Sequence, residues 1–270
     1  MPLRDLKYKS DQTILKVYGY GENKKIKVIC VNWLRTAGVE DDEEYRAPKG
    51  SVNDFKIENN IYRAKSIIFE YAFCNPWDWF FTGTLDPKKY DRTNLDKFHK
   101  DLTQWFRDYG KQHKVKIKFL LVPERHLDGI SWHIHGFLYG LPKEHLKQFV
   151  VGDVMGKGLA EKVKRGDVVY NWLPYAKKFG FCDLEPIKNP EAVSKYMMKY
   201  INKNLASSVK ELNAHLYYHS RGLNKAELIK KGVMAAPITP TYENEYCSVA
   251  WLDYSEELLQ ELSSSFLDIG

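Results

Sequence analysis

One predicted β-hairpin constrains this chain more than any other stretch, because it gathers ionisable side chains on one face of a sheet. Residues 131–139 (Ser-Trp-His-Ile-His-Gly-Phe-Leu-Tyr) are rich in aromatic and β-branched residues, which predicts a strand. Side chains alternate between the two faces of a strand, so His133 and His135 share one face. Two imidazoles held in this way can bind the same metal ion.

The preceding strand supplies a carboxylate to the same face. Residues 116–124 predict a strand that ends at Glu124, and Asp128-Gly129 is a strong hairpin-turn signal. With these two residues at the centre of the turn, Glu124 lies directly opposite His133. Opposed residues share a face, with Cβ atoms about 5 Å apart. His126 falls on that face too, and it is a candidate fourth ligand or phosphate contact.

Two imidazoles and one carboxylate, from His133, His135 and Glu124, leave coordination positions open. By ligand softness this donor set suits Mn²⁺, Fe²⁺ or Zn²⁺ better than Mg²⁺. The competing interpretation is that each histidine is an ordinary half-buried aromatic residue of a strand. That interpretation weakens when two histidines are in register and face a carboxylate.

A second segment predicts a helix that carries two phenols. Asn189-Pro190 is a start signal, because Asn caps helices and Pro is favoured in the first turn. Tyr196 and Tyr200 are four residues apart and therefore lie on one face. A buried stripe is predicted beside them, made of Val193, Met197 and Ile201.

Two lysines repeat the spacing of the tyrosines, so the segment is a tandem Tyr-x-x-Lys that ends at Lys203. A phenol is a poor nucleophile at neutral pH, because its pKa is near 10. A metal-polarised phosphate, together with the charges of Lys199 and Lys203, would ease both the attack and the developing negative charge. The alternative is an amphipathic helix with tyrosines at its boundary.

Together these motifs resemble the HUH endonucleases. His133-Ile134-His135 looks like their His-hydrophobic-His signature, and Tyr196–Lys203 resembles the two-tyrosine motif of initiators from small single-stranded DNA phages and rolling-circle plasmids. Residues 80–86 are similar to the family's first motif, although Gly83 stands where a bulkier residue is expected. The resemblance covers roughly residues 62–223.

The resemblance implies an α+β fold with a ferredoxin-like (RRM-like) antiparallel sheet and the tyrosine helix packed across one face. It implies site-specific nicking and rejoining of single-stranded DNA through a 5′-phosphotyrosine, which starts rolling-circle replication. Mn²⁺ or Mg²⁺ would be held by His133, His135 and Glu124. Tyr196 or Tyr200 would attack the phosphate. The expected partners are a single-stranded DNA origin and, because the chain has no recognisable helicase motif, a host helicase and DNA polymerase.

Three alternatives stay open at this point. A one-tyrosine transposase or relaxase of the same superfamily would use a single nucleophile. A non-catalytic module could bind single strands on exposed sheet aromatics, since fold alone does not establish function. A metal-dependent hydrolase would release its products by attack of water.

The charge pattern also favours a nucleic-acid partner. Residues 232–270 hold seven acids and no Lys or Arg, which leaves the first 231 residues with 41 basic and 28 acidic side chains. Residues 190–231 hold eight Lys or Arg against three Glu, so a basic surface is expected around the tyrosine helix. The competing interpretation is a solvated helix face.

The rest of the chain bounds compartment and organisation. There is no apolar run long enough for a membrane span, no signal-peptide pattern and no paired cysteine spacing, so we expect a bacterial cytoplasm and reduced thiols. Three segments are predicted: an N-terminal hairpin and helix extension (1–73), the endonuclease domain (74–231) and an acidic C-terminal segment (232–270). The remaining predicted elements are a hairpin over 13–34, helices over 60–73, 93–109, 142–150 and 255–266, and strands over 78–85, 182–187, 214–219 and 242–252.

Overall fold

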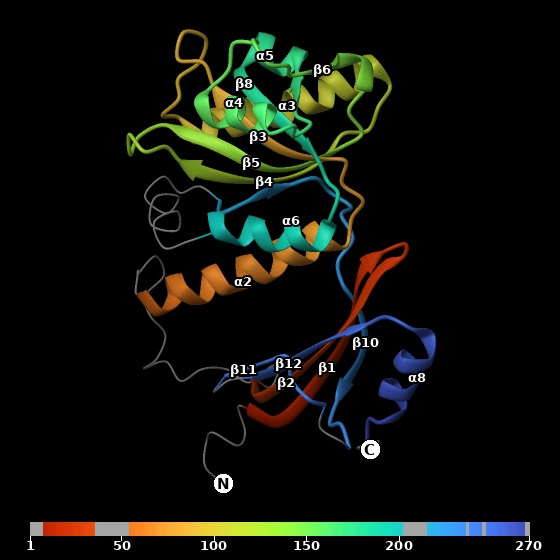
Figure 1. The fold of residues 1–270 in the computed structure, drawn as a ribbon. Helices are drawn as coiled ribbons and strands as arrows, with labels where there is room; N and C mark the ends of the chain where they lie inside the picture. The colour runs from red at the N-terminus through yellow and green to blue at the C-terminus, as the bar shows by residue number, and fades with distance from the viewer. Residues whose placement is uncertain (1–7, 36–53, 202–214, 236–237, 245–246, 268–270) are drawn as a thin grey trace. The chain divides into compact units, whose positions relative to one another are not determined.

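The protein is an α+β structure, as predicted, and every strand pairing among its described residues is antiparallel (Figure 1). The computed structural model describes residues 8–35, 54–201, 215–235, 238–244 and 247–267. Its contacts form two compact units, residues 1–52 with 224–270 and residues 53–223. The three segments predicted from the sequence, with boundaries after 73 and 231, stay a prediction.

The first unit is a five-stranded sheet with one helix. Its strand order is β10-β1-β2-β12-β11, formed by β1 (Tyr8–Tyr20), β2 (Asn23–Arg35), β10 (Glu227–Gly232), β11 (Tyr242–Glu243) and β12 (Cys247–Asp253). The predicted hairpin is confirmed: Tyr20 pairs with Asn23 across a two-residue turn that begins at Gly21, whose φ is +55°. Alternating side chains such as Leu15 and Val28 form the core against helix α8 (Glu256–Ser264).

One prediction in this unit needs correction, and one strand was not predicted. The strand expected over 242–252 is two short strands, β11 and β12, which pair with each other. Strand β10 was not predicted from the sequence; it pairs with β1, which lies near the other end of the chain. A pairing between such distant segments leaves no local signal, and residues 227–232 (Glu-Leu-Ile-Lys-Lys-Gly) show no clear alternation of polar and apolar side chains.

The second unit is built on a seven-stranded sheet of order β6-β7-β8-β3-β5-β4-β9. The strands are β3 (Trp79–Leu85), β4 (Lys118–Arg125), β5 (Trp132–Tyr139), β6 (Leu146–Gln148), β7 (Tyr170–Trp172), β8 (Gly180–Pro186) and β9 (Tyr218–His219). The helix predicted over 142–150 is wrong. A 3₁₀ turn, η2 (Lys143–His145), leads there into β6, which pairs with β7 some way further along the chain. That pairing outweighs the helical pattern of the segment.

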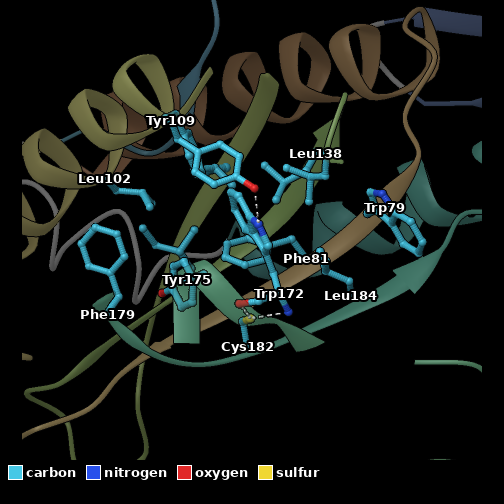
Figure 2. Close-up of a cluster of buried hydrophobic side chains, with 14 of the residues drawn as sticks. Trp79, Phe81, Leu102, Tyr109, Leu138, Trp172, Tyr175, Phe179, Cys182 and Leu184 are labelled. Atoms are coloured by element: carbon cyan, nitrogen blue, oxygen red, sulfur yellow. Dashed lines mark hydrogen bonds between the residues drawn. The ribbon is translucent and has the colours of Figure 1, made fainter. Parts of the chain in front are cut away.

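One face of this sheet is closed by α3 (Leu95–His113) and α5 (Leu173–Lys178). Asn94 caps α3 by accepting a hydrogen bond from the backbone N–H of Lys97. Figure 2 shows the aromatic core of this face, where the indole of Trp172 donates to the hydroxyl of Tyr109 at 3.4 Å. Trp172 and Tyr175 are completely buried.

The other face carries α2 (Asp54–Phe73), α6 (Pro190–Met197) and the 3₁₀ turn η3 (Met198–Tyr200). Figure 1 shows α2 and α6 side by side, and the two helices are in contact. Ile68 of α2 and Met197 of α6 pack in one core with Phe80 and Phe137 of the sheet. The tyrosine helix therefore lies across one face of the sheet, as predicted. A further helix, α4 (Lys157–Lys164), lies between β6 and β7 in the chain.

Within the described residues, no helix combines the length and apolar character that a membrane crossing requires.

Candidate active site

Four strands place the ionisable side chains in rows across the sheet. On one row, the register sets Phe181 of β8 opposite Thr84 of β3, Thr84 opposite His133 of β5, and His133 opposite Glu124 of β4. Residues that face each other across antiparallel strands share a face. The predicted pairing of Glu124 with His133 is thereby confirmed. The next row runs from Asp183 through Thr82 to His135.

The turn between β4 and β5 fixes this register. The backbone N–H of His126 donates to the carbonyl of Ser131, and Gly129 adopts a φ of +73°. Asp128 accepts a hydrogen bond from the side chain of Ser131 and further ones from the backbone N–H groups of Ser131 and Ile130, and together these hold the pKa of its carboxyl well below the ordinary value. The Asp-Gly signal read from the sequence is thus the physical cause of the alignment.

Glu124 lies among three imidazoles. Its Oε2 is 2.7 Å from Nε2 of His135. That hydrogen bond, and then the neighbouring imidazoles of His135, His133 and His126, lower the pKa of the Glu124 carboxyl. The ring of His126 stacks on that of His133 with centroids 4.0 Å apart. Burial first, and then the neighbouring imidazoles, lower the pKa of His133 to about 4, which keeps it neutral at pH 7.

Two threonines of β3 orient the histidine rings. The hydroxyl of Thr84 is 2.9 Å from Nδ1 of His133, and that of Thr82 is 3.4 Å from Nδ1 of His135. A partner at one ring nitrogen fixes the tautomer and the ring orientation, as the outer-shell partners of metal-bound histidines do. In His135 this turns Nε2 toward Glu124. Both threonines belong to residues 80–86, the stretch that resembles the family's first motif, and the register gives them this physical role.

The donor set fits a divalent transition-metal ion by its chemistry, since neutral imidazoles and an ionised carboxylate are the forms that bind metal. Among the residues that the structure describes, no three His, Cys, Asp or Glu side chains are already arranged around a common point. Glu124 and His135 instead bond directly to each other. A metal ion between them would replace the proton that they share. Metal binding by His133, His135 and Glu124 stays a prediction.

The tyrosine helix begins where the sequence indicated. The side chain of Asn189 accepts a hydrogen bond from the backbone N–H of Ala192, and Pro190 is the first helical residue. The α-helix ends at Met197 and tightens into a 3₁₀ turn that ends at Tyr200. This tightening changes the twist of the last turn, yet both phenols still lie on the same side.

The two tyrosines lie over the histidine face. The ring of Tyr200 stacks on His135 with centroids 4.2 Å apart and planes at 15°. Its hydroxyl donates to that of Tyr196 at 3.1 Å. Tyr196 packs its ring edge-on against Phe80 and is 43% exposed. One pocket of about 450 Å³ therefore contains both phenols and His135.

Tyr200 is held in its protonated form. Burial raises the pKa of this phenol, and the hydrogen bond to Tyr196 and the negative charges of Glu124 and Asp183 raise it further. A phenolate at this position therefore requires added positive charge, from a metal ion or from nearby lysines.

The predicted lysines have different outcomes. Nζ of Lys199 lies 4.7 Å from the ring centroid of Tyr196. Lys203 lies outside the described residues, as does part of the segment for which a basic surface was predicted.

Lys162 of α4, which the sequence did not single out, lines the pocket that contains Tyr196 and Tyr200, here called the tyrosine pocket. It bonds to Glu185 at 2.6 Å. Burial lowers the pKa of Lys162, but Glu185, with Asp183 and Tyr196, outweighs burial and raises it.

Asp183 is the second residue that the sequence did not single out. Burial raises the pKa of its carboxyl against the opposing hydrogen bond from Thr82. Its Oδ1 is buried without a hydrogen-bond partner among the described groups. The alternation of β8 was the available signal, because it places Asp183 and Glu185 on the face opposite Cys182 and Leu184.

The packing around β3 explains why position 83 is a glycine. A Cβ at this position would lie 2.6 Å from Cζ of Phe81 and 2.7 Å from the hydroxyl oxygen of Tyr175. The closed face of the sheet therefore has no room for the bulkier residue that the resemblance led us to expect.

Part of the chain is similar to a family of known proteins. Residues 78–205 match the model of the replication-associated protein ORF2/G2P family. The matched range begins just before β3 and contains β5 and both tyrosines, so the similarity covers the candidate site. No curated protein matches the chain. No solved structure matches it either.

Proposed function

We propose that this chain, whose residues 78–205 are similar to replication-associated proteins, is an HUH endonuclease of the two-tyrosine class that starts rolling-circle replication. It would nick and rejoin single-stranded DNA at an origin. The observation that carries the proposal is the stacking of Tyr200 on His135 while its hydroxyl contacts that of Tyr196. Two nucleophiles thus lie over the candidate metal ligands in one pocket.

The reaction is a transfer of the phosphoryl group to tyrosine. The phenol oxygen attacks the scissile phosphorus and loses its proton, the bond to the 3′-oxygen breaks, and that oxygen gains a proton. The products are a 5′-phosphotyrosine and a free 3′-OH, which primes synthesis. Because the phosphodiester energy is kept in the new bond, the reverse reaction rejoins ends without a nucleotide cofactor.

The chain's own residues would prepare this step. Thr82 and Thr84 hold the histidine rings in position. Lys199 and Lys162 place positive charge beside Tyr196, where negative charge develops. Mn²⁺ or Mg²⁺ held by His133, His135 and Glu124 would withdraw charge from the scissile phosphate.

The second tyrosine gives the site a second turnover. The two hydroxyls lie 3.1 Å apart in one pocket, so once one phenol is esterified the other would be placed to attack the regenerated origin. This role calls for single-stranded DNA as substrate and a host helicase and polymerase as partners, in the cytoplasm of a bacterial cell.

The test is covalent adduct formation on a denaturing gel. Labelled single strands from the element that encodes the chain are incubated with Mn²⁺ or with chelator. We expect a metal-dependent adduct that Tyr196→Phe and Tyr200→Phe each weaken and that the double variant abolishes. Tyr62→Phe, which changes an exposed tyrosine of α2, is the matched control.

Other outcomes point to the other functions. Cleavage without an adduct indicates hydrolysis by water. Binding that is indifferent to metal and to His133→Ala, without cleavage, indicates a binding module. Normal production of many circles by Tyr200→Phe indicates a one-tyrosine transposase or relaxase.

A further inference from the structure

A second pocket lies beside the tyrosine pocket on the same face of the sheet. Its volume is about 520 Å³, within the range of about 300–1,000 Å³ that is typical of ligand pockets. The two pockets share Thr82 in their linings, so the second pocket is within reach of a strand whose phosphate lies at the tyrosines. The lining residues that matter here are Thr84, Asn171, Phe181 and Asp183 from the sheet and Val154 and Leu159 near α4.

The apolar part of this lining is open to solvent. Phe181 is 66% exposed and Val154 is fully exposed. Phe181 occupies the same row as Thr84 and His133, so it stands on the sheet at the edge of the candidate active site. An exposed aromatic ring beside a phosphate site is the platform on which single-strand-binding proteins stack bases.

The polar part offers both a hydrogen-bond acceptor and a donor. Oδ1 of Asp183 is buried without a partner among the described groups, which is costly until a donor reaches it. The terminal torsion of an Asp side chain is soft, so a small rotation presents this oxygen to the pocket. The side-chain oxygen of Asn171 accepts a hydrogen bond from Sγ of Cys182 at 3.4 Å, so its amide nitrogen is the group that can donate to a ligand.

We propose that this pocket binds one nucleobase of the single strand, turned out beside the phosphate that lies at Tyr196 and Tyr200. Phe181 stacks on the base, and Asp183 and Asn171 contact its polar edge. Since Asp183 accepts, the pocket prefers a base with an exocyclic amino group, which adenine, cytosine and guanine carry and thymine lacks. The inference rests on the proposed function for its choice of ligand, and it adds a specificity subsite to that function.

Binding measurements test the pocket without any cleavage. The parent protein carries both Tyr196→Phe and Tyr200→Phe, so no covalent adduct interferes. Fluorescence anisotropy compares oligo-dA, oligo-dC, oligo-dT and a fully abasic strand, each of about 15 nucleotides, close to the largest site of one single-strand-binding domain. The abasic strand has the same backbone charge and separates base contacts from phosphate contacts.

Three variants in this parent give distinct results. Phe181→Ala should weaken binding of oligo-dA and oligo-dC by about fivefold or more and leave the abasic strand unchanged. Tyr62→Ala, which removes an exposed aromatic ring of α2, should change neither. Asn171→Leu, which removes the donor amide, should weaken binding of oligo-dC and leave the abasic strand unchanged.

The proposal is overturned if Phe181→Ala binds all strands like its parent, or if it loses the abasic strand to the same extent. A thermal unfolding curve for Phe181→Ala, whose side chain is mostly exposed, checks that the fold is retained. The gel assay of the wild-type protein reports separately on the proposed function. An absent adduct with base-dependent binding through Phe181 removes the nicking chemistry and keeps the pocket, whereas an adduct with no effect of Phe181→Ala removes only the pocket.

Discussion

The two faces of the seven-stranded sheet are made by the same strands but differ in what they hold. In β3, Phe81 and Leu85 belong to the buried aromatic core under α3 and α5, whereas Thr82 and Thr84 hydrogen-bond the histidines on the other face. Alternation along each strand therefore separates stability from chemistry. We call the face under α3 and α5 the closed face, and the face that carries the histidines and the tyrosine pocket the open face. Substitutions on the closed face should lower stability, and substitutions on the open face should lower activity.

The largest effect is expected from Trp172→Ala on the closed face. The indole is completely buried, stacks on Phe106 and donates to the hydroxyl of Tyr109. Removing a buried Trp leaves a large cavity and should lower the free energy of unfolding by about 3–5 kcal/mol. Denaturant unfolding measures it, and a loss below about 1 kcal/mol would contradict the idea that this face carries the stability.

His135→Ala should give the opposite result. The ring contacts both Glu124 and Tyr200, so nicking should fall by more than the roughly 10–100-fold that removal of an outer-shell partner costs. The free energy of unfolding should fall much less than it does in Trp172→Ala. His113→Ala, at the end of α3 on the closed face, is the control and should keep full activity. Equal losses of activity in His135→Ala and His113→Ala would contradict the distinction between the two faces.

Much of the open face could be predicted because its determinants are local. The alternation of β5 and the Asp128-Gly129 turn fix the position of Glu124 relative to His133 within a short stretch of chain. The start of the tyrosine helix is equally local, since the Asn189 cap and the following Pro define it. Signals of this kind can be read from the sequence because they depend on neighbouring residues and not on contacts with distant segments.

Other parts of the site depend on contacts between distant segments. Lys162 comes from α4, a helix that was not predicted from the sequence, and it lines the tyrosine pocket where it pairs with Glu185 of β8. The absence of a side chain at Gly83 depends on Tyr175, which is far away in the chain. The chemical roles of these residues follow from neighbours that no single-sequence pattern specifies.

Thr84→Val tests whether the hydroxyl of Thr84, on the open side of β3, positions His133. The change keeps the shape and removes the hydroxyl that bonds Nδ1 of His133 at 2.9 Å. Metal affinity, measured by Mn²⁺ titration of adduct formation, should fall by roughly 10–100-fold. Thr103→Val, on the exposed side of α3, should leave the titration unchanged. An unshifted titration in Thr84→Val would mean that the threonine does not position the ligand.

Gly83→Ala should lower stability by about 1–3 kcal/mol, because the new methyl group meets Phe81 and Tyr175 on the closed face. Activity per folded molecule should be retained, since the methyl group points away from the histidines. Thermal unfolding and adduct formation at a temperature well below the transition measure the two quantities. A stable but inactive variant would show that the two sides of β3 are coupled.

The smallest effect is expected from Lys162→Met on the open face. Its ion pair with Glu185 is partly exposed, and such pairs contribute only about 0–1 kcal/mol, so stability should hardly change. Loss of a positive charge beside Tyr196 should nevertheless slow adduct formation several-fold. Lys100→Met removes an equally short pair with Asp96 on α3 and should have no effect on the rate.

Glu185→Gln then separates the two explanations for Lys162. If the lysine acts by its charge on the phosphate, freeing it from Glu185 keeps or raises the rate of adduct formation, because the carboxylate no longer neutralises it. If the ion pair acts by holding α4 against β8, Glu185→Gln slows the reaction as much as Lys162→Met does. The second result would place Lys162 with the residues that build the pocket, and the charge beside Tyr196 would then come from Lys199, whose Nζ lies over that ring.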